Sequence, residues 1–264
     1  MAKKRSAAAH CAPGVSMGID LQESIPVIAL AGNPNTGKTT LFNRLTGMRQ
    51  HTGNWPGKTV VRAEGDTTIG SKIFRVIDLP GTYTLSAASA EERVAREFIC
   101  FGRPDVTLVV ADATALERNL SLVLQAMEIT PKVVLCVNLI DEAHRKGIDV
   151  NTAKLQQRLG IPVVATSART GAGVPELLDA VEAVYSGQIQ PTPFQVRYSP
   201  GIEEAVEDLL PMIADRVGDR ANARWIALKL VEGDRSIAAA LQEHFGQVDL
   251  PLLTHLDPGM EATS

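Results

Sequence analysis

Short apolar runs alternate with longer amphipathic stretches along the first two thirds of the chain. The runs are rich in β-branched residues and end at Gly, Pro, Asn or Asp, a pattern typical of buried strands; they cover residues 27–31, 73–77, 106–111, 133–137 and 161–165. The intervening stretches are helix candidates and cover 39–48, 90–101, 118–127, 152–159 and 174–185. This alternation predicts an α/β domain with a mostly parallel sheet of about six or seven strands and helices on both faces.

One pair of runs departs from the strand–helix alternation. Residues 60–68 and 72–77 are separated only by Ile69-Gly70-Ser71. Such a short connection cannot contain a crossover helix, so it predicts a hairpin and one antiparallel edge strand.

The pattern changes after Tyr185, where Ser186-Gly187 and Pro191-Thr192-Pro193 interrupt the chain and no buried strand follows. Apolar residues then recur at helical spacing on one face, and two further helical pieces are expected at 225–231 and 237–245; the stripe contains Ile202, Ala205, Val206, Leu209, Leu210 and Ile213. A helical unit of this size is marginal alone, so we expect it to pack on the first domain. The predicted division is a disordered tail at 1–24, an α/β domain at 25–186, a small all-α domain at 187–246 and a tail at 247–264.

Composition and charge exclude several classes of protein. No apolar run approaches the ~20 residues that span a bilayer. The net charge is −4 and basic residues cluster only in the first five positions, so nucleic-acid binding is not expected. The three cysteines, Cys11, Cys100 and Cys136, are odd in number and far apart, which favours a reducing compartment.

A phosphate-binding pattern follows the first predicted strand. Two glycines flank four residues and are followed by Lys and Thr; the segment is Gly32, Asn33, Pro34, Asn35, Thr36, Gly37, Lys38, Thr39 and Thr40. Backbone N–H groups of such a loop curl around an anion, and the following helix adds its positive N-terminal end. Lys38 is expected to neutralise the β and γ phosphates, and the Thr39 hydroxyl to bind Mg²⁺.

Three later motifs follow predicted strands. The first completes the Mg²⁺ and phosphate site, and the other two identify the base. Asp78, Leu79, Pro80 and Gly81 fit a Mg²⁺-binding carboxylate and a γ-phosphate-sensing N–H. Asn138, Leu139 and Asp141 fit a guanine site, because a carboxylate accepts hydrogen bonds from guanine N1–H and the 2-amino group but finds no such pair on adenine. Ser167, Ala168 and Arg169 can offer backbone N–H groups to guanine O6. Four such motifs in this order at four strand ends predict a P-loop protein that binds guanine nucleotides.

Together these motifs resemble the cytosolic GTPase portion of the bacterial ferrous iron transport protein B family. The most specific part is the segment that contains Gly53, Asn54, Trp55, Pro56, Gly57, Lys58 and Thr59, because generic small GTPases lack it. The resemblance runs from about residue 27 to 245 and includes Arg224-Trp225-Ile226-Ala227-Leu228-Lys229-Leu230 in the helical domain. It implies a Ras-like P-loop GTPase (G) domain, a helical domain similar to a guanine-dissociation inhibitor, and a membrane region that passes Fe²⁺, which is absent here.

The resemblance also implies roles for individual residues. Thr59 matches the threonine of switch I, residues about 50 to 60, that joins Mg²⁺ and the γ phosphate. Asn35 matches an asparagine that binds K⁺ together with backbone carbonyls near Gly53 and Trp55, so Asn35, Lys38, Thr59 and Gly81 are the expected catalytic residues. Thr82 stands where many small GTPases have a water-orienting glutamine, and Leu139 where the common guanine motif has lysine. Slow intrinsic hydrolysis, stimulated by K⁺, is the expected consequence.

The resulting hypothesis is a GTP-hydrolysing domain that regulates or drives ferrous iron uptake, with GTP or GDP, Mg²⁺ and K⁺ as cofactors. Its expected partner is the membrane-embedded C-terminal region of the same transporter, at the cytoplasmic face of the bacterial inner membrane, and a homo-oligomer stays open. The chain is then a soluble fragment of a longer protein. An RNA- or ribosome-associated GTPase is the alternative, although the acidic stretch Glu203-Glu204-Ala205-Val206-Glu207-Asp208 disfavours it. A P-loop kinase or ATPase would make Asn138 and Asp141 accidental.

Trp55 and the His10-Cys11 pair each allow two interpretations. Trp55 fits either a partner-binding anchor or an exposed switch residue whose backbone carbonyl does the work, whereas Trp225 is expected in a core. The His10-Cys11 pair has no second pair at ligand spacing, which favours a solvated tail over a metal site.

Overall fold

The computed structural model describes residues 25–48, 50–86 and 88–246. The two predicted tails, 1–24 with its His10-Cys11 pair and 247–264, lie outside the described residues. So the prediction of disorder for residues 1–24 stays a prediction.

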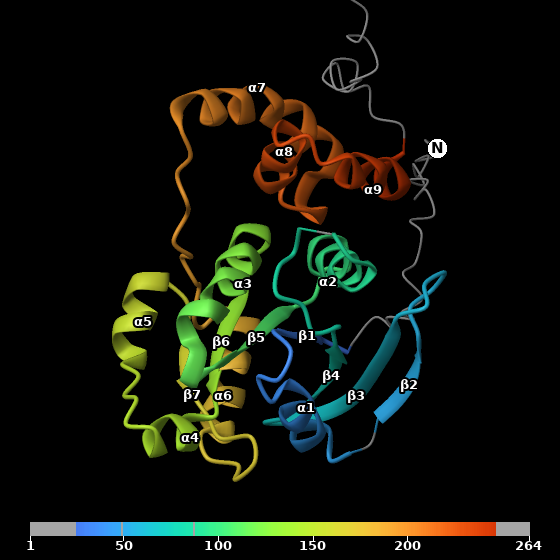
Figure 1. Ribbon diagram of the computed structural model, residues 1–264. Coiled ribbons are helices and arrows are strands. Elements are labelled where there is room, and N and C mark those ends of the chain that lie inside the picture. The colour runs from blue at the N-terminus through green and yellow to red at the C-terminus, as the bar shows by residue number, and fades with distance from the viewer. Residues whose placement is uncertain (1–24, 49, 87, 247–264) are drawn as a thin grey trace, which may run out of the picture.

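A seven-stranded sheet in the order β2-β3-β4-β1-β5-β6-β7 forms the centre of the first domain (Figure 1). Five strands are mutually parallel: β1 (Val27–Gly32), β4 (Lys72–Asp78), β5 (Val106–Asp112), β6 (Val133–Asn138) and β7 (Val163–Ala165). Their carboxyl ends meet at one edge of the sheet, which is where open α/β sheets bind ligands. This edge carries all four predicted motifs.

Two further strands complete the sheet. β3 (Val61–Ile69) runs antiparallel to β4, and β2 (Gln50–Asn54) pairs antiparallel with β3 at the edge. The predicted hairpin is present as β3 and β4, but β3 is not the edge strand, because β2 pairs with its outer side. The sequence gives no signal for β2, since Gln50-His51-Thr52-Gly53-Asn54 is polar and contains glycine. Pairing with β3 through a short turn stabilises this strand instead.

Helices cover both faces of the sheet. α1 (Lys38–Thr46) and α6 (Val174–Tyr185) pack on one face, and α2 (Ala90–Phe101) and α3 (Leu116–Ile129) on the other. Alternate residues of β1 enter the two cores, Ile28 and Leu30 on the α1 side and Ala29 and Ala31 on the α2 side. The short helices η1 (Ala113–Ala115), α4 (Ile140–Arg145) and α5 (Thr152–Leu159) complete the domain. The hydrophobic pattern does not predict α4, which is only six residues long.

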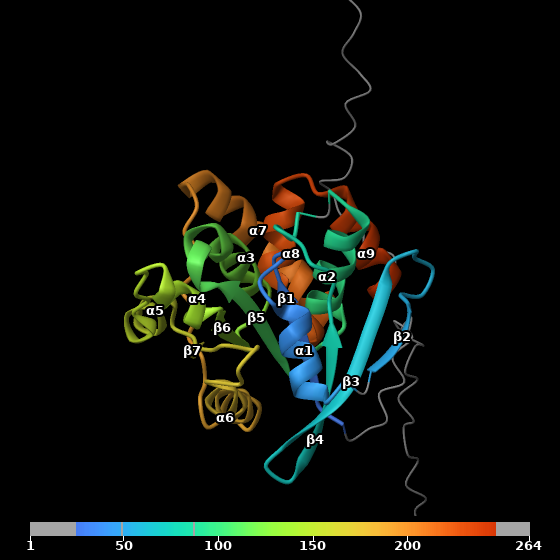
Figure 2. The same cartoon turned by 60° about the horizontal axis from the view of Figure 1, so that its bottom comes forward.

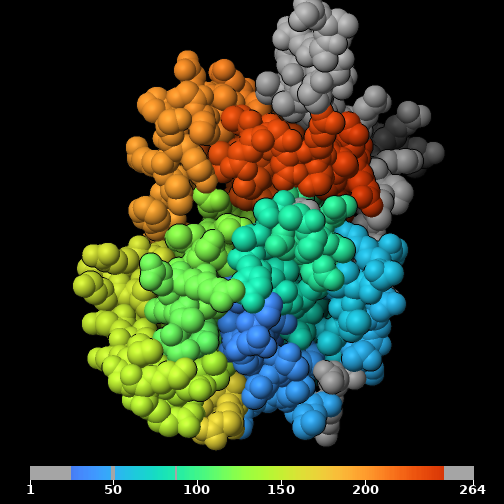
Figure 3. All heavy atoms as spheres, in the orientation of Figure 1, coloured from blue at the N-terminus to red at the C-terminus, as the bar shows by residue number. Residues whose placement is uncertain are grey.

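The helical domain lies against α2 and α3, as Figure 1 and the space-filling view in Figure 3 show. It consists of α7 (Pro200–Val217), η2 (Gly218–Arg220), α8 (Ala223–Val231) and α9 (Arg235–Phe245). Val206, Leu209 and Ile213 of the predicted stripe are buried, and so is Trp225. They share one hydrophobic cluster with residues of α2 and α3, which confirms that the helical domain packs on the first domain.

Polar contacts fix this docking. Arg96 of α2 is fully buried and donates to Asp234 Oδ2 at 2.6 Å and to Ser236 Oγ at 2.7 Å. Asn222 donates to the Glu128 carbonyl at 2.9 Å. A buried charge that loses its partner is costly, so these bonds hold the helical domain in one position.

None of the helices in the described part of the chain is both long and apolar enough to cross a membrane. This agrees with the short apolar runs of the sequence.

Candidate nucleotide-binding site

The loop between β1 and α1 presents a row of free backbone donors. Within the described residues, the N–H groups of residues 35 to 40 donate to no protein acceptor. The loop itself is held by the Thr36 hydroxyl, which donates to the Asn33 carbonyl at 2.9 Å. Free N–H groups at a helix N-terminus form an anion site, so the loop fits a polyphosphate.

Two positions in this loop require special backbone geometry. Gly37 has a φ of 78°, and a Cβ there would lie 2.4 Å from Asn138 Nδ2, so only glycine fits. Asn35 is exposed with a φ of 67°, a conformation that asparagine tolerates better than most residues. The loop therefore packs tightly against the guanine motif at Gly37 and leaves the Asn35 side chain accessible.

Lys38 and Asp78 meet at the centre of the site. The ammonium donates to Asp78 Oδ1 at 2.5 Å and to the Leu79 carbonyl at 2.6 Å. Burial raises the pKa of Asp78, and the charge and hydrogen bond of Lys38 oppose that shift. A carboxylate with an exposed Thr39 hydroxyl at the start of α1 is a hard-oxygen donor set, which suits Mg²⁺.

The segment after Asp78 lies beside the phosphate loop. The Thr82 N–H donates to the Gly32 carbonyl at 3.3 Å, and Thr82 is buried. The Gly81 N–H has no acceptor among the described residues. Gly81 therefore retains a free donor. It lies beside the phosphate loop, because a Cβ added to Gly81 would lie 3.5 Å from Pro34.

Asn138 joins the guanine motif to the phosphate loop. Its side chain is fully buried and donates to the Thr36 carbonyl at 2.9 Å. It accepts from the Thr166 hydroxyl at 3.1 Å and from the Ala168 N–H at 2.9 Å. Leu139, which has a φ of 61°, packs near Gly37 in place of the usual lysine stem. Thr166 is a residue that sequence reasoning missed, although it directly precedes the predicted Ser167 segment.

Asp141, the carboxylate predicted to bind guanine, lies in the first turn of α4 and is partly exposed. Its Oδ2 accepts from the Arg169 guanidinium at 2.7 Å, and this bond is the main reason that the pKa of Asp141 is lowered. The carboxylate is therefore ionised at neutral pH, as guanine recognition requires. In this conformation guanine must displace Arg169 to reach Asp141 Oδ2.

Two backbone N–H groups of the Ser167 to Arg169 segment already have acceptors within the protein. The Ser167 N–H donates to the Ala172 carbonyl at 2.9 Å, and the Ala168 N–H to Asn138. On its outer side, Arg44 of α1 donates to the Ala168 carbonyl at 2.5 Å and to the Arg169 carbonyl at 2.7 Å. No sequence signal marks Arg44, because its partners are backbone carbonyls more than a hundred residues away.

Residues 50 to 60, the predicted switch I, fold as β2 and a turn. The Trp55 N–H donates to the Val60 carbonyl at 2.9 Å, and the Trp55 carbonyl accepts from Lys58 N–H at 3.0 Å. Lys58 also reaches Glu97 of α2 at 2.7 Å, whereas Thr59 is exposed. The turn is therefore docked on α2.

Trp55 itself is buried, with 2% of its surface exposed, and packs on Phe98 and beneath Arg62. The sequence interpretation of Trp55 as an exposed switch residue is wrong for the side chain in this conformation. Its other parts, a partner-binding role and a role of the backbone carbonyl, stay predictions. Trp55 is buried because it packs on Phe98 of α2. A local sequence pattern cannot reveal a contact with such a distant residue.

The expected K⁺ residues are not gathered in this conformation. Gly53 lies in β2, which β3 and β4 separate from β1 by roughly 14 Å of sheet. β2 runs in the same direction as β1, so its Asn54 end lies at the same edge as the phosphate loop. A K⁺ site with Asn35, Gly53 and Trp55 therefore requires switch I to rearrange.

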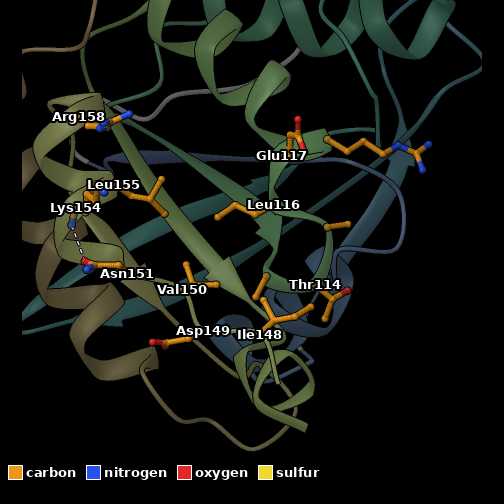
Figure 4. A pocket seen from close by; sticks show the side chains of 13 residues that line it. Thr114, Leu116, Glu117, Ile148, Asp149, Val150, Asn151, Lys154, Leu155 and Arg158 are labelled. Atoms are coloured by element: carbon orange, nitrogen blue, oxygen red, sulfur yellow. Dashed lines mark hydrogen bonds between the residues drawn. The ribbon is translucent and has the colours of Figure 1, made fainter. Parts of the chain in front are cut away.

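A separate cavity of about 620 Å³ lies between the start of α3 and α5 (Figure 4). Leu116, Ile148, Val150 and Leu155 form an apolar floor, and Lys154 and Arg158 lie at one rim. It contains none of the predicted nucleotide-site residues. The cavity is therefore distinct from the phosphate and guanine sites.

The chain matches two family models. Residues 26–181 match ferrous iron transport protein B, and residues 198–255 match the FeoB cytosolic helical domain. Among curated proteins, it is 42% identical over 214 residues to an Fe(2+) transport protein A/Fe(2+) transporter FeoB fusion protein of Porphyromonas gingivalis, covering 80% of this chain and 25% of that protein. It is 34% identical to Fe(2+) transporter FeoB of Escherichia coli, covering 87% and 30%. The chain thus spans between about a quarter and a third of the length of these relatives.

Solved structures of FeoB cytosolic domains resemble the whole described fold. The cytosolic domain of T. maritima FeoB in apo form is 37% identical with a TM-score of 0.75, covering 86% of this chain and 88% of that one. The GMPPNP form of the same domain is 38% identical, also with a TM-score of 0.75 and the same coverage.

Proposed function

This chain belongs to the ferrous iron transport protein B family, with its G domain and cytosolic helical domain, and we propose that it binds guanine nucleotides and hydrolyses GTP. The row of free N–H groups at residues 35 to 40, beside Lys38, carries this proposal. Solved relatives in GDP and GMPPNP forms support it.

Recognition of the two ends of the nucleotide uses different chemistry. The phosphates would accept from the loop N–H groups and from Lys38. The Lys38 ammonium would then leave Asp78 and bind a phosphate oxygen instead. The base would donate N1–H and its 2-amino group to Asp141. Its O6 would accept from the Arg169 N–H, because the Ser167 and Ala168 N–H groups already donate within the protein. Adenine offers no such donor pair, so the site selects guanine.

Hydrolysis relies on charge stabilisation rather than on a side-chain base. Thr39, Thr59 and Asp78 would hold Mg²⁺, which supplies positive charge at the phosphates. Gly81 offers its free N–H to the γ phosphate, and buried Thr82 has no amide side chain with which to orient water. We propose that K⁺ supplies positive charge in the transition state and makes the slow hydrolysis potassium-dependent. Asn35 would bind it together with the Gly53 and Trp55 carbonyls of a rearranged switch I.

The proposed cellular role follows from the family and the relatives. The domain would regulate or drive ferrous iron uptake at the cytoplasmic face of the bacterial inner membrane, through a membrane-embedded partner region of the same transporter. The docked helical domain supports a route for that coupling, because α2 contacts both switch I and α9.

Competitive binding tests this proposal. Unlabelled GDP, GTP, ADP and ATP are titrated against a fluorescent guanine nucleotide at fixed Mg²⁺, and released phosphate is measured with GTP and with ATP. GDP and GTP should compete at concentrations at least about a hundredfold below those of the adenine nucleotides. Equal competition by ATP would contradict the guanine site, and GTP binding with no phosphate release would contradict hydrolysis.

A further inference from the structure

Arg44 has a position that neither the phosphate motif nor the guanine motifs explain. It lies in the last turn of α1, six residues after Lys38, so a rigid helix segment of roughly 9 Å joins it to the phosphate site. Its Nε and one terminal nitrogen donate to two consecutive carbonyls, those of Ala168 and Arg169. A single planar guanidinium thus binds both peptide groups, which a lysine cannot do in the same geometry.

The receiving loop is shaped for this guanidinium. Gly171 has a φ of 92°, and a Cβ there would lie 2.9 Å from the Arg44 NH1 atom. Asn138 holds the opposite side of the same loop through the Ala168 N–H. The loop is therefore clamped between Asn138 on the inside and Arg44 on the outside, with α1 beside it (Figure 2).

We propose that Arg44 is a positioning residue for guanine recognition, which holds the Ser167 to Arg169 segment at the base and thereby slows release of the nucleotide. This inference rests on the proposed binding of guanine nucleotides. Arg44 does not touch the nucleotide in this account. It acts through the peptide group between Ala168 and Arg169, whose carbonyl accepts from Arg44 and whose N–H donates to no acceptor in the described part of the chain. It also ties that loop to the helix that begins at the phosphates.

The test compares nucleotides that differ only at the base edge. GDP and inosine diphosphate both have O6 and N1–H, and inosine diphosphate lacks the 2-amino group. 2-Aminopurine riboside diphosphate keeps the 2-amino group but lacks both O6 and N1–H. Dissociation rates of all three are measured from the unaltered chain, from Arg44→Ala and Arg44→Lys, and from Arg75→Ala. Arg75 is a matched control, because it is a surface arginine paired with Asp66 at 3.0 Å, away from the loop.

Arg44→Ala should release GDP and inosine diphosphate about tenfold faster, the equivalent of one lost charge-assisted hydrogen bond. Release of 2-aminopurine riboside diphosphate should change by less than about twofold, because no O6 contact remains to lose. Arg44→Lys should release GDP at a rate between those of the unaltered chain and Arg44→Ala. Arg75→Ala should release it as the unaltered chain does.

Equal acceleration of all three nucleotides, or no acceleration of any, would overturn the role of Arg44. Failure of the unaltered chain to bind GDP would instead contradict the proposed function itself. Melting temperatures of Arg44→Ala and Arg75→Ala, measured without nucleotide, should agree within a few degrees. A large loss of stability confined to Arg44→Ala would assign the residue to the fold and also overturn the proposal.

Discussion

The indole of Trp55 packs edge-to-face on the ring of Phe98, with their centroids 5.3 Å apart. Trp55 belongs to switch I and Phe98 to α2, the helix whose Arg96 binds the helical domain. The contact therefore links the proposed switch I to the helix on which α9 docks. If Thr59 moves to Mg²⁺ and the γ phosphate, as the family resemblance implies, Trp55 lies only four residues away and must leave this pocket.

Tryptophan fluorescence can detect that movement. The chain has two tryptophans, so Trp225→Phe leaves Trp55 as the sole reporter. GMPPNP with Mg²⁺ should shift its emission to longer wavelength, because the indole moves from a buried apolar site into water, whereas GDP should leave it nearly unchanged. The Trp55→Phe variant, which keeps Trp225 in the helical core, should show no such shift. Identical spectra with GDP and GMPPNP would mean that Trp55 stays docked.

The buried Arg96–Asp234 pair predicts a dependence of stability on pH. Burial acts to raise the pKa of Asp234, but bonds from Ser236 and the charge of Arg96 outweigh it, and the pKa is lowered from 3.8. A carboxyl whose folded pKa is depressed contributes stability that is fully present above the unfolded pKa. That contribution is lost as the pH falls below about 3.8 and through the folded pKa.

Asp234→Asn isolates the charge, since asparagine can still cap α9. At pH 7 it should lower the free energy of unfolding by about 3 kcal/mol, because Arg96 stays buried without its counter-ion. Urea unfolding at pH 7 and near pH 3 should show a smaller difference between variant and unaltered chain at acid pH. Asp208→Asn, an exposed change on α7, should be neutral at both. An Asp234→Asn chain as stable as the unaltered one at pH 7 would contradict the role of the pair.

The sequence predicted the parallel strands, their helices and the placement of four motifs at one sheet edge because these features depend on local periodicity. It failed at β2 and α4, which are short and polar and owe their structure to β3 and to the end of β6. It also failed at Trp55, whose burial depends on Phe98 more than forty residues away. The same applies within the site. Asn138 and Asp141 follow a recognisable pattern, whereas Arg44 binds backbone carbonyls and its side chain alone carries no signature of a site.

Asp141 should determine the choice of base. Asp141→Asn replaces an acceptor pair with an amide, so guanine N–H groups lose a partner while the xanthine O2 gains a donor. Affinity for GDP should fall about a hundredfold and affinity for xanthosine diphosphate should rise. The change also breaks the bond from Arg169, so Arg169→Ala serves as the control and should keep guanine selectivity. Unchanged GDP affinity in Asp141→Asn would contradict the assignment.

The proposed potassium mechanism makes a prediction about salts. Thr82 is buried and lacks an amide, and Arg62 lies in β3 paired with Glu64 and stacked on Trp55, so neither is placed to stabilise the leaving phosphate. Some other positive charge is then needed in the transition state. GTP hydrolysis should be faster in KCl than in NaCl at equal ionic strength, which keeps general screening constant.

Asn35→Ala should remove that difference between salts. Its GDP affinity should stay within about threefold, because Lys38 and the free loop N–H groups remain in place and supply most of the phosphate binding. Asn43→Ala, a change in the middle of α1, is the control and should keep the preference for KCl. Since the Gly53 and Trp55 carbonyls reach the site only when switch I rearranges, K⁺ should also strengthen the Trp55 emission shift with GMPPNP. Equal hydrolysis rates of the unaltered chain in the two salts would eliminate the mechanism.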